Sequence, residues 1–109
     1  MEPKEREILF YETATGHAVC REWLDGLEAG GKEIYGIVMA RLERVAGGNF
    51  GDCEPVGEGV SELRIDVGPG YRVYFSLDGD FIILLLGGTK ATQQRNIPKA
   101  KKFWRDYNA

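Results

Sequence analysis

The sequence has few residues of the kinds that bind metals or form disulfides. It holds one histidine and two cysteines, Cys20 and Cys53, in 109 residues. No histidine or cysteine lies at a metal-ligand spacing around either cysteine, so we expect two reduced thiols. The composition therefore predicts neither a metal site nor any other cofactor.

Long hydrophobic runs are also missing. The longest, residues 81–86, has six residues, whereas a membrane-spanning helix needs about 20. Residues 1–7 are mostly charged and contain no apolar stretch, so they do not resemble a signal peptide. We expect a cytoplasmic protein with no membrane partner. Residues 1–109 are enough for one domain, and 43% hydrophobic with 28% charged residues is ordinary for a globular one.

The net charge of −3 is small but unevenly distributed. Residues 1–89 carry a balance of −8, and residues 90–109 carry a balance of +5. This asymmetry indicates an anionic partner for the C-terminal end. On charge alone, a solvated helix face is the more common explanation.

The first half of the chain predicts one strand and two helices. Residues 7–12 are apolar and aromatic, as expected of a strand. Apolar residues then recur at helical spacing over residues 16–28 and again from Ile34 to Val45, separated by Gly30-Gly31. Two helices joined by so few residues form a helical hairpin. Residues 49–59 are expected to form a loop.

The second half predicts three strands and a final helix. The strands cover residues 60–67, 71–77 and 81–87, and Gly68-Pro69-Gly70 and Asp78-Gly79 are typical turns between them. Asn96 is expected to cap a helix that runs from Ile97 to Tyr107, with Pro98 in its first turn. The predicted fold is α+β: a single antiparallel sheet with an N-terminal helical hairpin and a C-terminal helix.

Strand alternation predicts a cluster of cations on one open face of this sheet. Leu63 and Ile65 should face the helices, which turns Glu62, Arg64 and Asp66 outward. On the next strand, Arg72 and Tyr74 share that outer face, and Lys90 follows the strand beyond. Two guanidinium groups and one ammonium group suit a phosphate. The alternative is that Arg64 forms only a surface salt bridge.

A block of sequence resembles one toxin family. It runs from Gly48 to Ile65, continues through residues 68–75 and 84–88, and includes Lys90, Thr92, Gln93 and Ile97. These residues are similar to the signature of RelE/HigB-like toxins of type II toxin–antitoxin systems, in the branch of phage-derived addiction-module killer proteins. The resemblance implies a RelE-like fold.

The resemblance also implies an activity and its partners. Many such toxins cleave mRNA in the ribosomal A site, and a co-expressed antitoxin blocks them. We therefore expect a ribosome-dependent endoribonuclease in a hetero-oligomer with a cognate antitoxin of helix-turn-helix type. Arg64, Arg72 and Lys90 match the phosphate-handling positions of the family, and Tyr74 is the best candidate for acid–base work. The positive C-terminal segment supplies candidate RNA contacts, namely Arg95, Lys99 and Lys102.

Three departures from the family pattern leave other functions open. Thr89 stands where an acidic residue is usual, Ala91 where a serine is common, and Asn96 where an aspartate is usual. A non-catalytic toxin that inhibits DNA gyrase by binding is one alternative, and a decayed toxin that only binds its antitoxin is another. The single histidine, His17, is expected on the surface, and the sequence does not place Tyr107 near the cations.

Overall fold

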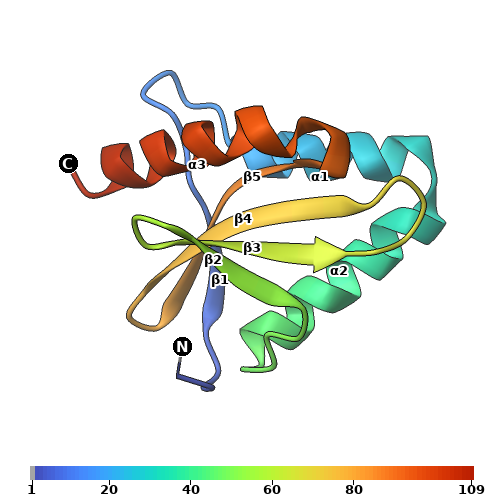
Figure 1. Ribbon diagram of the computed structural model, residues 1–109, viewed down its shortest axis with the longest axis horizontal. Helices are drawn as coiled ribbons and strands as arrows, with labels where there is room; N and C mark the ends of the chain where they lie inside the picture. Colours follow the sequence, from blue (N-terminus) through green and yellow to red (C-terminus); the bar gives the residue numbers. More distant parts are fainter. Residues whose placement is uncertain (1) are drawn as a thin grey trace.

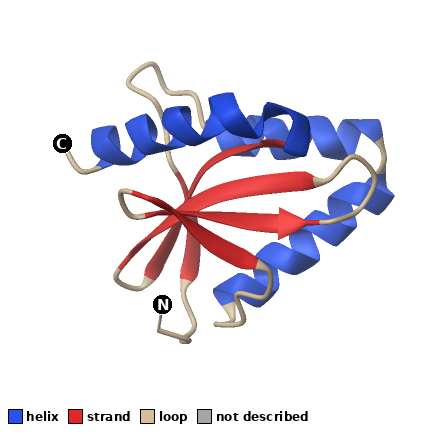
Figure 2. Cartoon of the chain, in the orientation of Figure 1, coloured by secondary structure: helices blue, strands red, loops and turns tan. Residues whose placement is uncertain are grey.

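The protein is a five-stranded sheet with helices on both faces (Figures 1 and 2). The computed structural model describes residues 2–109. The elements follow in the order β1 (Glu7–Phe10), α1 (Val19–Gly30), α2 (Lys32–Ala46), β2 (Cys53–Gly57), β3 (Val60–Ile65), β4 (Tyr71–Asp78), β5 (Phe81–Thr89), the 3₁₀ turn η1 (Lys90–Thr92) and α3 (Gln93–Tyr107). This arrangement confirms the α+β class.

The sheet is mixed, with the strand order β1-β5-β4-β3-β2. Strands β2 to β5 form an antiparallel meander, whereas β1 pairs with β5 in parallel. The expectation of a fully antiparallel sheet is therefore wrong at β1. The helical hairpin α1–α2 connects β1 to the far edge of the sheet, and the meander then returns beside β1. Local sequence patterns do not set the direction of a pairing this distant in sequence.

The expected loop at residues 49–59 contains an additional strand. Strand β2 pairs with β3, placing Pro55 opposite Ser61. Proline has no N–H to donate to a neighbouring strand, so it is excluded from central strands but tolerated at a sheet edge, where β2 lies. Glu58 and Gly59 both have positive φ, 55° and 83°, which is the conformation of a tight hairpin turn. The proline and glycines of this segment are typical of loops, so the sequence did not predict the edge strand β2.

Two hydrophobic clusters lie on opposite faces of the sheet. Helices α1 and α2 cover the first face, where Leu63, Val73 and Phe75 are buried as alternation predicts. Helix α3 covers the second face and packs on residues such as Tyr74 and Ile83. Figure 1 shows α3 running across the sheet, from the end of β5 to the C-terminus. The second face is therefore covered along α3, although the sequence predicted an open face.

Helix α3 begins four residues earlier than expected, at Gln93. The hydroxyl of Thr89 and that of Thr92 form a reciprocal capping box around η1, which starts the helical turns before Asn96. The predictions that Asn96 caps the helix and that Pro98 lies in its first turn are wrong. Asn96 is inside α3 and donates from Nδ2 to Thr92 Oγ1 at 2.7 Å.

None of the helices within residues 2–109 combines the length and the apolar character that crossing a membrane requires.

Candidate functional site

Two arginines face each other across the centre of the site. Arg64 on β3 and Arg72 on β4 are direct partners in the antiparallel register. Like charges directly opposite each other destabilise a strand pair, so the pairing requires nearby acids or an anion. This placement agrees with the prediction that both arginines share one face. Together with Lys90 they are called the cation cluster below.

Arg72 is the most buried member of the cation cluster, with 5% of its surface exposed. Its Nη1 donates to the backbone oxygen of Tyr71 at 3.0 Å and lies 3.5 Å from a carboxylate oxygen of Asp66. Its buried Nε has no hydrogen-bond partner. An unpaired donor in a buried guanidinium group is costly.

Lys90 lies where the turn between β3 and β4 meets the end of β5. Its backbone N–H donates to the oxygen of Gly70 at 2.9 Å, and its side chain is exposed. A Cβ atom on Gly70 would lie 3.5 Å from Lys90 Cβ and 3.6 Å from Arg72 Nη1. Both distances are ordinary van der Waals contacts, so Lys90 and Arg72 both lie beside Gly70, whose φ of 81° favours glycine.

Behind the cation cluster is a fully buried carboxylate, Glu62, with 0% exposure. It accepts a bond from Arg64 Nε at 2.9 Å and one from the Tyr74 hydroxyl at 3.0 Å. Gln93 Nε2 donates to both of its oxygens, at 3.0 and 2.8 Å. We call these four residues the Glu62 network. It joins β3, β4 and the first residue of α3.

The Glu62 network was not predicted from the sequence. Alternation placed Glu62 on an exposed face, and the placement is wrong because α3 covers that face. Glu62 and Tyr74 lie directly opposite each other in the β3–β4 register, which strand alternation alone does not reveal. A buried carboxylate and a buried hydroxyl this close are expected to form a hydrogen bond.

Tyr74 has no exposed surface, and burial together with the neighbouring Glu62 carboxylate raises the pKa of its hydroxyl. Arg72 and Arg64 act in the opposite direction but do not outweigh these effects. A phenol with a raised pKa is a poor proton acceptor near neutral pH. The hydroxyl instead serves as a hydrogen-bond donor that holds Glu62.

The basic residues of α3 divide into two groups. Lys101 and Arg105 approach Glu58 in the β2–β3 turn, at 3.9 and 2.9 Å. Arg95, Lys99 and Lys102 are exposed, and their spacing of four and three residues places them along one side of the helix. The three residues predicted to contact RNA therefore form a continuous positive stripe.

Two further candidates, His17 and Tyr107, have hydrogen-bond partners outside the cation cluster. His17 precedes α1, and its exposed ring is 3.1 Å from a carboxylate oxygen of Glu22 inside that helix. The Tyr107 hydroxyl donates to Asp78 Oδ2 at 2.6 Å, at the far end of β4 from Arg72. Asp78 lies six positions along the strand from Arg72, which is about 20 Å. Neither side chain belongs to this site.

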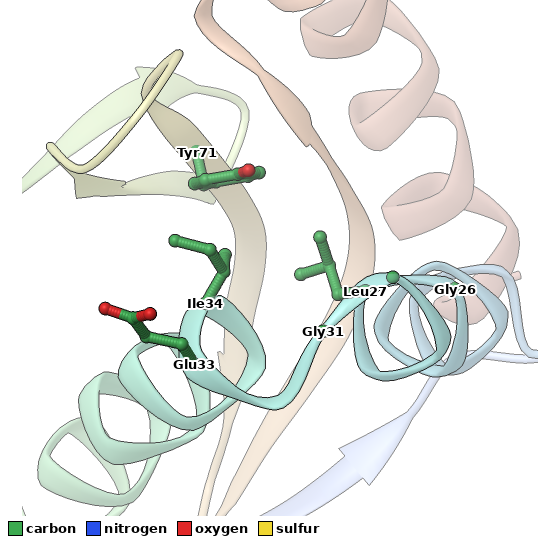
Figure 3. Close-up of a pocket in the computed structure, with 7 residues that line it drawn as sticks. Gly26, Leu27, Gly31, Glu33, Ile34 and Tyr71 are labelled. Carbon is green, nitrogen blue, oxygen red and sulfur yellow. The ribbon is translucent and has the colours of Figure 1, made fainter.

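A cavity on the opposite face of the sheet has a different character. Figure 3 shows it between the start of α2 and the ring of Tyr71, with Glu33 at its margin. Its volume is about 340 Å³, and it is lined by Gly26, Leu27, Gly30, Gly31, Glu33, Ile34 and Tyr71. It offers a carboxylate and no cation, so it does not suit a phosphate.

The fold and the site define a small α+β protein with clustered cations beside its C-terminal helix. An uncharacterized protein of Haemophilus influenzae is 51% identical to the chain over 65 residues, which are 59% of this chain and 66% of that protein. No family model matches the chain. The comparisons therefore name no activity.

Proposed function

We propose that this protein is the toxin of a type II toxin–antitoxin system, of the RelE/HigB-like kind, and that it cleaves mRNA on the ribosome in the cytoplasm. The observation that carries the proposal is the cross-strand pair Arg64–Arg72 with Lys90 beside it. The matching of these three positions to the basic positions of the family supports it from the sequence.

The cation cluster suits the chemistry of RNA cleavage by the neighbouring 2′-hydroxyl. In that reaction the 2′-hydroxyl loses its proton to water as its oxygen attacks phosphorus, the bond to the 5′-oxygen breaks, and the 5′-oxygen takes up a proton to leave as a hydroxyl. Negative charge gathers on the phosphoryl oxygens during the attack. Fixed cations aimed at those oxygens supply much of the stabilisation in such reactions. Arg72, held by Tyr71 and Asp66, and the exposed Lys90 are positioned for this role.

The Glu62 network supports the same role by fixing Arg64. Because Glu62 accepts a bond from Nε, the outer part of the guanidinium group points away from the carboxylate. Glu54 approaches it there at 3.4 Å but is exposed on an edge strand. An RNA phosphate competes easily with such an exposed ion pair, which contributes only about 0–1 kcal/mol.

The proposed partners are the ribosome with its mRNA and a cognate antitoxin of helix-turn-helix type. Free RNA is bound mainly through neutralisation of its phosphates, which a protein with a net charge of −3 does poorly. A ribosome that presents the mRNA would remove the need for tight binding of free RNA. The positive stripe of Arg95, Lys99 and Lys102 adds to the cation cluster on the RNA side.

A second candidate function is favoured by Tyr74. Its hydroxyl is buried and bonded to Glu62, so the residue expected to act in proton transfer is already engaged. A toxin that acts by binding alone, as on DNA gyrase, needs no proton transfer. Growth arrest with intact mRNA, and resistance through gyrase mutations, would support this second function.

Induced expression in a bacterium tests the proposal. The wild type should arrest growth and shorten mRNA, and Arg72→Ala should do neither. Arg44→Ala, which removes an exposed arginine from the last turn of α2, is the matched control and should remain toxic. Thermal melting of each purified variant separates loss of activity from loss of fold. Arrest by a folded Arg72→Ala variant would refute the role of the cation cluster.

A further inference from the structure

The two edges of the sheet differ in how they are protected. β2 forms one edge and carries Pro55, which has no N–H to offer a further strand. β1 forms the other edge and contains neither proline nor lysine, the residues that commonly block pairing at an edge. Near its centre, Leu9 has 41% of its surface exposed. The β1 edge therefore has the properties of a strand that pairs with another chain.

The hydrogen bonds between β1 and β5 show which backbone groups face the open edge. The N–H groups of Glu7 and Tyr11 donate to the backbone oxygens of residues 80 and 84, at 2.9 and 3.0 Å. Because alternate residues of a strand face opposite neighbours, residues 7, 9 and 11 pair with β5. The N–H and C=O groups of residues 8, 10 and 12 consequently point toward the open edge.

These free groups define the register in which a second copy of the chain fits. In a two-fold antiparallel pair centred on Phe10, residues 8, 10 and 12 of one protomer lie opposite residues 12, 10 and 8 of its partner, and each exchanges both backbone hydrogen bonds. A pair centred on Ile8 or Leu9 would instead need the N–H of Arg6, which already donates to the oxygen of Ala46 at 2.7 Å. The register centred on Phe10 uses the free edge without disturbing that bond.

Leu9 and a hollow at the end of β1 become neighbours in this register. Leu9 and Tyr11 project to the face that α3 covers, because alternate side chains of a strand share a face. The hollow has a volume of about 630 Å³, and its lining includes Tyr11, Asp106 and Tyr107. Leu9 of one protomer would lie directly opposite the partner's Tyr11, at a Cβ separation of about 4.5–5.5 Å. The exposed leucine of each protomer is thereby brought to the hollow of the other.

Opposite charges also meet across this edge. Glu12 and Arg21 are both exposed, and neither takes part in the ion pairs found within residues 2–109. Arg21 Cζ lies 5.7 Å from the centroid of the Phe10 ring. In the paired sheet, Glu12 is the diagonal neighbour of the partner's Phe10 on the same face. The Glu12 carboxylate therefore comes within reach of the partner's Arg21, and the symmetry repeats this contact.

We propose that β1 pairs with β1 of a second copy of this chain, antiparallel and centred on Phe10, so that the two sheets join into one. Contacts of this two-fold kind are self-complementary and close after two copies. The inference does not depend on the proposed function. The interface also leaves the cation cluster open, because β5 separates β1 from the strands that carry Arg64 and Arg72.

The oligomeric state in solution tests the pairing. Sedimentation equilibrium of the full chain up to about 100 µM should show twice the 12.2 kDa mass of one chain. Leu9→Lys places a charge at the interface and should raise the dissociation constant at least about tenfold. Ile37→Lys is the matched control, since Ile37 on α2 is similarly exposed at 38%. It should change the dissociation constant less than about twofold.

Three results of that experiment would overturn the inference. They are a wild type that stays monomeric at every concentration, a dimer that persists in Leu9→Lys, and equal effects of the two lysine variants. The last would show general apolar association rather than pairing of β1. Far-UV circular dichroism of each variant establishes that the chain remains folded.

Charge reversal tests the register without altering the apolar contacts. Glu12→Arg and Arg21→Glu should each raise the dissociation constant about fivefold, because each places like charges together across the interface. The double variant restores opposite charges and should return to within about twofold of the wild type. Additive weakening in the double variant would contradict the contact between Glu12 and the partner's Arg21, and with it the register centred on Phe10.

Discussion

Glu62 carries its charge in a position with no exposed surface. Burial of a carboxylate without compensation costs several kcal/mol. Here donors from Arg64, Tyr74 and Gln93 offset that cost. The arrangement orients Arg64 and secures the start of α3, so we expect the Glu62 carboxylate to serve both stability and the position of the cation cluster.

Removal of Glu62 tests this balance. Glu62→Ala leaves the buried hydroxyl of Tyr74 and the amide of Gln93 without their acceptor, and we expect the free energy of unfolding to fall by about 3 kcal/mol. Urea denaturation measures the change. Glu54→Ala, which removes an exposed partner of Arg64, should change it by less than about 0.5 kcal/mol. Equal effects would contradict the network.

Cys20 gives a prediction for alkaline pH. Burial raises the pKa of its thiol to about 12 from an ordinary value of 9.0. The unfolded chain therefore loses this proton at a lower pH than the folded protein. The contribution of the thiol to the free energy of unfolding is complete below pH 9 and is lost between about pH 9 and 12. In that range Cys20→Ala should reduce the slope of unfolding free energy against pH by about 1.4 kcal/mol per unit. An unchanged slope would argue against burial of the thiol.

At the scale of elements, the packing of α1 on β5 depends on the missing side chain of Gly87, because Trp23 occupies that space. Gly87→Ala forces a methyl group into the indole of Trp23, and overpacking of this kind costs about 1–3 kcal/mol. Gly26→Ala in α1 is the control, since nothing lies within 4 Å of its Cβ position. The control should stabilise the protein by about 0.5–1 kcal/mol, because alanine favours helix. Thermal melts that rank the two variants in the opposite order would refute this packing.

Elements with a strong periodic pattern were predictable, and elements defined by distant partners were not. The α1–α2 hairpin and strands β3, β4 and β5 follow their apolar spacing, with ends displaced by a few residues. Strand β2 was missed because Pro55 and Gly57 weaken its local signal, and pairing with β3 overrides it. The covering of one sheet face by α3 depends on tertiary packing, so Glu62 and Tyr74 were wrongly expected to be exposed.

For the whole molecule, charge separation is the main electrostatic feature. The chain has a net charge of −3, yet Arg95, Lys99 and Lys102 form an exposed positive stripe on α3. If the stripe contacts RNA, replacing all three by alanine should reduce the slope of log affinity against log salt by about 2, at about 0.7 per cation. Titration of a short single-stranded RNA at several salt concentrations measures this slope. An unchanged slope would remove the stripe from the interface.

The site was partly predictable from sequence at this scale. Alternation places Arg64 and Arg72 on one face, and the register makes them direct partners. Lys90 follows β5 as expected. The burial of Glu62 beneath Gln93 and the packing of Trp23 on Gly87 arise from contacts between residues more than 20 positions apart. Sequence spacing alone does not carry that information.

The most direct measurement is cleavage of mRNA on programmed ribosomes by the purified protein. Lys90 is suited to it because its side chain is exposed, so Lys90→Ala should leave the fold intact. We predict that the wild type and Lys32→Ala, an exposed lysine in the first turn of α2, cut at equal rates, and that Lys90→Ala is slower by about 100-fold or more. Equal cutting by Lys90→Ala, or no cutting by the wild type, would contradict the proposed function of the cation cluster.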